Sequence, residues 1–99
     1  MKIVYAKEAI QDLEEIEEHL SQHNDAEAVD KRLDKIDIEI KRLEGNPNIG
    51  SWLKNRIAKE ADWRYTVCGR YVIFYLIKGD IIEITRITDG RQNWTKTLF

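Results

Sequence analysis

The sequence lacks most of the residues on which disulfide scaffolds, metal clusters and membrane spans depend. Among its 99 residues there is one cysteine and one proline. A single cysteine excludes an intrachain disulfide and a thiolate metal cluster. No apolar run approaches the roughly 20 residues that a membrane-spanning helix needs, and the opening stretch 1–15 turns acidic before a signal-peptide core could form. We therefore expect a cytoplasmic protein with no membrane partner, and one domain over residues 1–99.

Residues suited to nucleophilic or metal-dependent catalysis are also scarce. Cys68 lies in "YTVCG" beside a predicted turn, and both histidines lie far from it in a predicted helix. We expect Cys68 to pack as a small apolar side chain. His19 and His23 have the spacing of two zinc ligands, but no third ligand accompanies them beyond the glutamates of an acidic helix face. The sequence thus predicts no metal site and no cofactor.

Charge is nearly balanced over the whole chain but not along it. The net charge is −2. Residues 1–50 hold 7 Lys/Arg against 13 Asp/Glu, a balance of −6, whereas residues 51–99 hold 9 against 5, a balance of +4. An anionic partner would therefore meet the second half of the chain.

Apolar periodicity in the first half predicts a strand and two helices. The β-prone stretch "KIVY" predicts a strand over residues 2–5, and apolar residues at helical spacing predict a helix over 7–22. The second helix is predicted to start at an Asn24 cap, with Glu27 returning a hydrogen bond, and to end at Gly45. Its apolar seam, which suits packing against the first helix, consists of Val29, Leu33, Ile36, Ile40 and Leu43.

The second half predicts a connector and three strands. Residues 47–62 form the connector, with a short helical turn near 53–59. The segments "WRYTVCG", "RYVIFYLIKG" and "DIIEITRIT" read as strands joined by tight turns at Gly69 and Gly79. The fold class is therefore α+β: an N-terminal strand, a helical hairpin, then a three-stranded antiparallel meander. The pairing of the N-terminal strand stays open.

The middle and last strands differ in their predicted environment. Tyr71–Ile77 is apolar on both faces, so we expect it to be central and covered twice, with Phe74 buried. The last strand keeps one face apolar through Ile82 and Ile84, and Arg86 then interrupts that face.

Taken together, these segments resemble the RelE/ParE family of bacterial type II toxins. The resemblance covers nearly the whole chain, from "KIVYAKEAIQDLEEI" through "NPNIG" to "GRYVIFYLIKGDIIEITRITDGRQNW". It implies a toxin partnered by a cognate antitoxin in a hetero-oligomer, with operator DNA reached only through the antitoxin. It also implies a role in plasmid stabilization and growth inhibition. ParE-like members are thought to poison DNA gyrase without an enzymatic site, whereas RelE-like members cut mRNA on the ribosome.

The site residues favour the ParE-like branch. RNA cleavage needs a base, an acid and cations around the phosphate. RelE-like nucleases often carry an arginine where this chain has Val72, and a basic pair where it has Arg91 followed by Gln92; the tail has no tyrosine. The end Gly-Arg-x-x-Trp at residues 90–94 looks ParE-like. Many relatives read His-Gly-Arg where this chain has Asp89 before Gly90, which further weakens the nuclease reading.

Three functions remain open at this stage. The preferred one is a gyrase-binding inhibitor that is not an enzyme. The alternatives are a ribosome-dependent mRNA endoribonuclease and a non-toxic, antitoxin-binding relative, which the acidic Asp89 and the negative net charge favour.

The candidate target-binding residues are cationic or aromatic and lie in the basic half. They are Arg86, Arg91, Trp94, Lys54, Arg56, Lys59 and Arg64. Five of them also have a structural reading: Arg86 as an exposed strand residue, Trp94 as a core plug, and the connector cations Lys54, Arg56 and Lys59 as a solvated run. Since exposed arginines contribute little to stability, we expect a variant without Arg86 and Arg91 to fold normally but to lose toxicity.

Overall fold

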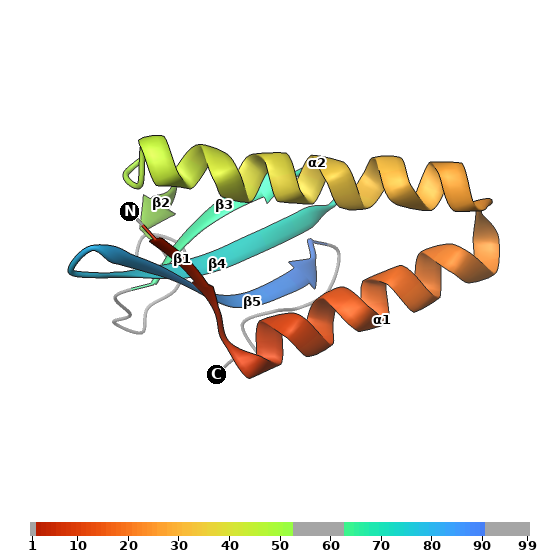
Figure 1. The fold of residues 1–99 in the computed structure, drawn as a ribbon, viewed down its shortest axis with the longest axis horizontal. Helices are drawn as coiled ribbons and strands as arrows, with labels where there is room; N and C mark the ends of the chain where they lie inside the picture. The colour runs from red at the N-terminus through yellow and green to blue at the C-terminus, as the bar shows by residue number, and fades with distance from the viewer. Residues whose placement is uncertain (1, 53–62, 91–99) are drawn as a thin grey trace.

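A mixed β-sheet with two helices packed on one face makes up the structure (Figure 1). The computed structural model describes residues 2–52 and 63–90. The architecture is of the α+β class that the sequence predicts. In chain order the elements are β1 (Lys2–Tyr5), α1 (Lys7–His23), α2 (Ala26–Gly45), β2 (Ser51–Trp52), β3 (Arg64–Cys68), β4 (Tyr71–Lys78) and β5 (Ile81–Asp89).

The strand order β1-β5-β4-β3-β2 makes neighbours of the first and last strands in the sequence. β1 runs parallel to β5, with Ile3 opposite Ile82, and every other pair is antiparallel. The three-stranded meander β3-β4-β5 is confirmed. Parallel strands need a crossover connection. Here the path between them includes the helical hairpin, which brings α1 and α2 onto the sheet.

β4 is the central strand, as the sequence predicts. Its residues Tyr71–Tyr75 are all buried in succession. The side chains of Tyr71, Ile73 and Tyr75 belong to the core that the two helices cover. Phe74 is completely buried but lies outside that core, with the ring of Trp63 at 6.1 Å between centroids. The prediction of a strand buried on both faces is confirmed for this stretch.

β2 is a strand that the sequence analysis placed in the connector. It has only two residues, paired with β3 through Ser51–Tyr65 and Trp52–Arg64. Two residues cannot display an alternating pattern, so periodicity gave no signal for it. The helical turn predicted near 53–59 lies outside the described residues.

A β-bulge in β5 corrects the expected placement of Arg86. Phe74 is opposite Arg86, but the next residue of β4, Tyr75, is opposite Ile84, so Thr85 is an extra residue. The extra residue shifts the alternation by one position. Ile84 and Ile87 therefore both join the core under the helices, and Arg86 does not interrupt that apolar face.

The turns between elements agree with the sequence in two cases and differ in one. Gly69 and Gly79 have φ of 60° and 61° and begin two-residue hairpin turns, as expected. The predicted Asn24 cap is wrong: Asp25 caps α2 by accepting the backbone N–H of Ala28 at 2.9 Å. Asn24 instead donates its side-chain amide to the Leu20 carbonyl at 3.0 Å, which completes the end of α1.

Candidate functional site

The structure describes only two of the seven candidate target-binding residues, Arg64 and Arg86. Lys54, Arg56 and Lys59 of the connector lie outside the described residues, and so do Arg91 and Trp94. The prediction that these seven residues contact the target therefore stays a prediction. The surroundings of Arg64 and Arg86 are described below.

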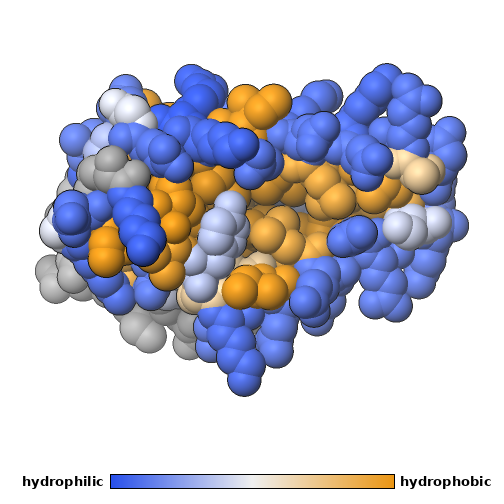
Figure 2. Space-filling view, in the orientation of Figure 1, coloured by the Kyte–Doolittle hydropathy of each residue, from blue (hydrophilic) through white to orange (hydrophobic). Residues whose placement is uncertain are grey.

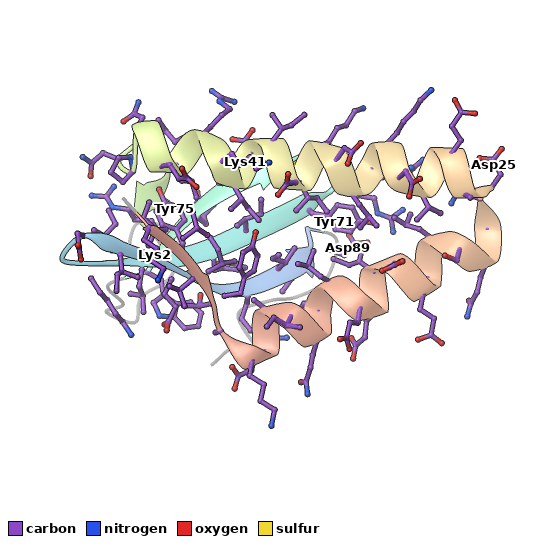
Figure 3. The ribbon with its side chains drawn as sticks, in the orientation of Figure 1. Lys2, Asp25, Lys41, Tyr71, Tyr75 and Asp89 are labelled. Atoms are coloured by element: carbon purple, nitrogen blue, oxygen red, sulfur yellow. The ribbon has the colours of Figure 1, made fainter. Side chains whose placement is uncertain are left out.

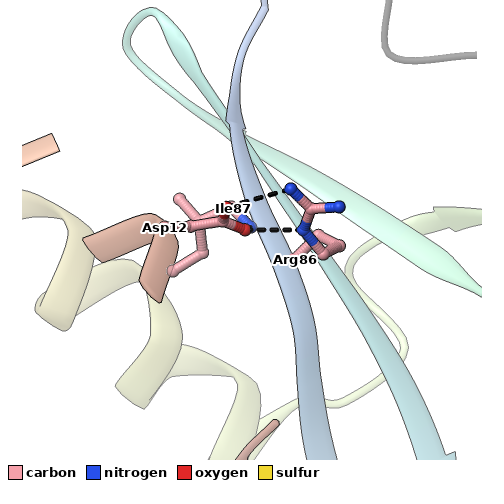
Figure 4. A network of polar contacts seen from close by, with 3 residues as sticks. All are labelled: Asp12, Arg86 and Ile87. Carbon is pink, nitrogen blue, oxygen red and sulfur yellow. Dashed lines mark hydrogen bonds and ion pairs between the residues drawn. The ribbon is translucent and has the colours of Figure 1, made fainter. Parts of the chain in front are cut away.

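Arg86 forms a bidentate ion pair with Asp12 of α1 (Figure 4). Its Nε donates to Oδ2 at 2.8 Å and its Nη2 to Oδ1 at 3.0 Å. The side chains are 25% and 11% exposed. The hydrogen bonds that Arg86 donates to Asp12 raise the pKa of Arg86, and the charges of Asp12, Glu8 and Glu15 add to this against the cost of burial. A fork-to-fork pair of this kind is among the stronger charge-assisted contacts.

Asp12 also accepts a backbone hydrogen bond from the edge of β5, where no strand of the described residues pairs with it. β1 pairs with β5 only as far as Tyr5 and Ile84, and the outer edge of β5 beyond this point meets α1. The carboxylate of Asp12 accepts the backbone N–H of Ile87 at 2.9 Å. A buried backbone N–H without an acceptor is costly. Asp12 supplies that acceptor for Ile87 and also accepts the hydrogen bonds of the Arg86 guanidinium.

Sequence reasoning missed Asp12, although a signal was present. Asp12 is three residues after Ala9 and four before Ile16, so it lies on the apolar side of α1. A carboxylate in that position needs a buried partner. This pair shows that Arg86 is not a solvent-exposed arginine. We therefore expect, contrary to the prediction from the sequence, that its removal lowers stability.

A second ion pair lies at the turn between β3 and β4. Arg70 donates to the Oδ2 atom of Asp89 from Nη2 at 2.7 Å and from Nε at 3.2 Å. Its guanidinium is 5.5 Å from the ring centroid of Tyr71. Figure 3 shows Asp89 beside Tyr71, its register partner, at the end of the sheet that points toward the turn between the helices. Asp89 thus has a cation as its partner.

The two ion pairs line one groove, which we call the charged groove. It has a volume of about 740 Å³ and lies between α1 and the last part of β5. From α1 it receives Asp12, Glu15 and His19, and from the sheet it receives Arg70, Arg86 and Asp89.

Arg64 is connected to the start of the connector. Its Nη1 donates to the Gly50 carbonyl at 3.2 Å, and the Gly50 N–H donates to the hydroxyl of Tyr75 at 3.0 Å. The same hydroxyl donates to the Pro47 carbonyl at 2.8 Å. Burial raises the pKa of Tyr75. This network fixes the point from which the connector with its three candidate cations departs.

A different groove separates the two helices, and we call it the interhelical groove. Figure 2 shows an apolar strip between α1 and α2. The groove has a volume of about 280 Å³, and its apolar lining includes Ile10, Leu13, Leu33, Ile36 and Ile40. Ile10 remains 47% exposed although it is a large apolar side chain.

Neither a metal centre nor a membrane span is built by the described part of the chain. His19 and His23 face each other edge to face at 5.1 Å between ring centroids. Within residues 2–52 and 63–90 no group of three or more His, Cys, Asp or Glu side chains is arranged to hold a metal ion. No helix in these residues has the length and apolarity to cross a bilayer.

Comparison with known proteins identifies a family and solved structures of the same fold. The family described as the ParE toxin of type II toxin–antitoxin system, parDE, matches residues 3–94. A solved chain from a chromosomal ParDE toxin–antitoxin system of P. aeruginosa shares the fold, with a TM-score of 0.76. The two are 22% identical, and the match covers 90% of this chain and 95% of that one. No curated protein sequence gave a significant match. Since the family match spans nearly the entire chain, the protein belongs to the ParE toxin family of type II toxin–antitoxin systems.

Proposed function

We propose that the chain inhibits growth by binding DNA gyrase and is neutralised by a cognate antitoxin in a hetero-oligomer. Family membership supports the toxin role. The ParE-like end at Gly90, Arg91 and Trp94 favours gyrase as the target. We place this activity in the cytoplasm and in one domain, with operator DNA reached only through the antitoxin.

The pairing of Arg86 with Asp12 is the observation that best supports a protein target over mRNA cleavage. A nuclease needs cations that are free to surround the phosphate. Nε and Nη2 of Arg86 are both taken by Asp12, and Arg70 is paired with Asp89. A phosphate in the charged groove would compete with two carboxylates and be repelled by Glu15.

Expression of the chain without antitoxin tests the target. Gyrase poisoning predicts filamentous cells with DNA-damage signalling, and the purified chain should inhibit DNA supercoiling by gyrase. A rapid arrest of translation with cleaved transcripts would identify the ribosome as the target and overturn the proposal. Normal growth would identify a non-toxic relative.

Arg91→Ala tests whether the strand end contacts the target. We expect growth inhibition to be lost while thermal unfolding stays unchanged, because the sequence places Arg91 in a polar stretch after the last strand, where an arginine usually contributes little to stability. Lys78→Ala is the control, since Lys78 is an exposed cation at the end of β4. Arg86→Ala is unsuitable as a first test because it leaves Asp12 buried without its cation. Full toxicity of Arg91→Ala would place the target surface elsewhere, with the connector cations as the next candidates.

The interhelical groove supports the antitoxin part of the proposal. Exposed apolar surface of this kind fits a segment that folds on its partner and buries apolar side chains there. Ile10→Asp should weaken neutralisation by the antitoxin, whereas Val67→Asp should not, because Val67 is similarly exposed at 58% but lies on β3. Retained neutralisation in Ile10→Asp would assign the antitoxin to another surface.

A further inference from the structure

The interhelical groove has an acidic rim above its apolar floor. Glu14 and Glu17 of α1 and Asp37 of α2 line it together with the apolar side chains. Glu14 and Glu17 are exposed and have no ion-pair partner among the residues that the structure describes. Asp37 is paired with Lys41 at 3.0 Å, and both remain more than half exposed. The free charge at the rim is therefore negative and lies mainly on α1.

The charges that act on Tyr5, a lining residue of the groove, are also mainly negative. Tyr5 lines the groove, and its pKa is raised, first by burial and then by the negative charge of Asp37, with Glu44 adding to the effect. Lys41 lowers the pKa of Tyr5 but does not reverse the shift. A partner's cation bound near Asp37 would offset this negative charge.

We propose that the segment bound in the interhelical groove is an amphipathic stretch of the antitoxin whose apolar anchors are flanked by lysine or arginine. The proposal rests on the proposed function, since the antitoxin is the partner that it describes. Apolar anchors would fill the floor, and cations would meet Glu14 and Glu17. A segment with acidic flanks would be repelled by both glutamates. A second copy of this chain would bring like-charged rims together, so the antitoxin is favoured over self-association.

Two synthetic amphipathic peptides test the sign of the flanking charge. They share the same leucine anchors at helical spacing and differ only in carrying lysine or glutamate flanks. We expect the lysine peptide to bind the full chain at least about tenfold more tightly in low salt, where rim charges are least screened. We also expect it to compete with the co-purified antitoxin.

Charge reversal in the rim supplies the matched variants. Glu14→Lys plus Glu17→Lys should weaken the lysine peptide by about tenfold or more and reverse the preference between peptides. Glu18→Lys plus Asp34→Lys makes the same change in net charge with exposed acids outside the groove, and it should change the affinity by less than about threefold. Ile10→Asp should remove binding of either peptide.

Several results would overturn the inference. Equal affinities, tighter binding of the glutamate peptide, or no binding of the lysine peptide would each do so. The same holds if the free chain is a dimer that Ile10→Asp converts to a monomer, because the groove would then belong to a second copy. Growth inhibition is measured separately, so absence of toxicity in the wild-type chain counts against the proposed function and leaves the peptide result to decide the groove.

Discussion

The two sides of helix α1 face grooves of opposite character. Toward β5, Asp12 is almost buried and is tied to Arg86 and to the backbone of Ile87. Toward α2, Ile10 is half exposed, and Glu14 carries a charge without an ion-pair partner in the described residues. In the charged groove, the ion pairs Asp12–Arg86 and Asp89–Arg70 are already made within the chain. In the interhelical groove, Ile10 stays half exposed and Glu14 has no ion-pair partner among the described residues, which suits a binding surface.

The comparison predicts that neighbouring acids on α1 differ greatly in their effect on stability. Asp12→Ala should lower the free energy of unfolding by about 2–3 kcal/mol, because it leaves a partly buried guanidinium and a strand N–H without their acceptor. Glu14→Ala should change it by less than about 0.5 kcal/mol. Chemical denaturation measures both. Equal effects would show that the two sides of α1 are energetically alike.

A smaller effect tests whether geometry or charge matters on the paired side. Arg86→Lys keeps the charge but loses the planar fork, so we expect a loss of about 1 kcal/mol. Arg70→Lys should cost less than about 0.5 kcal/mol, since Arg70 is 32% exposed and its pair uses a single carboxylate oxygen. If the order of the two losses is reversed, the pair at Arg70 is the more important one.

The smallest effect concerns the field in the interhelical groove. Asp37→Asn should lower the pKa of Tyr5, because it removes the largest charge that raises this pKa and leaves Lys41 to oppose burial. A raised pKa in the folded state means stability that is complete below the unfolded value of 10.0 and is lost as the pH rises through the folded value. Tyrosinate absorbance, with Tyr5→Phe subtracted, measures the shift. An unchanged or higher pKa would contradict an acidic field at Tyr5.

The fold was largely predictable because most of its signals are local. Helical spacing of apolar residues located both helices, and the unbroken apolar run of β4 identified the central strand. Turn glycines at 69 and 79 separated the strands of the meander. Each of these features depends on residues within a few positions of one another, so a reading of the sequence can recover it.

The candidate site was less predictable because its contacts join residues far apart in the sequence. Arg86 was recognised as unusual, but its partner Asp12 is 74 positions away. The bulge at Thr85, which decides the face that Arg86 takes, depends on register with β4 rather than on the residues of β5. The charge of Asp89 was visible in the sequence. Its pairing with Arg70 was not, because only the antiparallel pairing of β4 with β5 brings the two residues together.

By itself, the sequence determined the order of helices and strands, the α+β class and the separation of acidic and basic halves, since these follow from composition and periodicity along the chain. Only the tertiary structure decided that β1 lies parallel to β5, that Asp12 closes the edge of β5 beyond it, and that α1 divides a charged groove from an apolar one. The physical reason is that buried polar groups must find partners wherever the packed chain brings them, and those partners lie at distances along the sequence that no local pattern records.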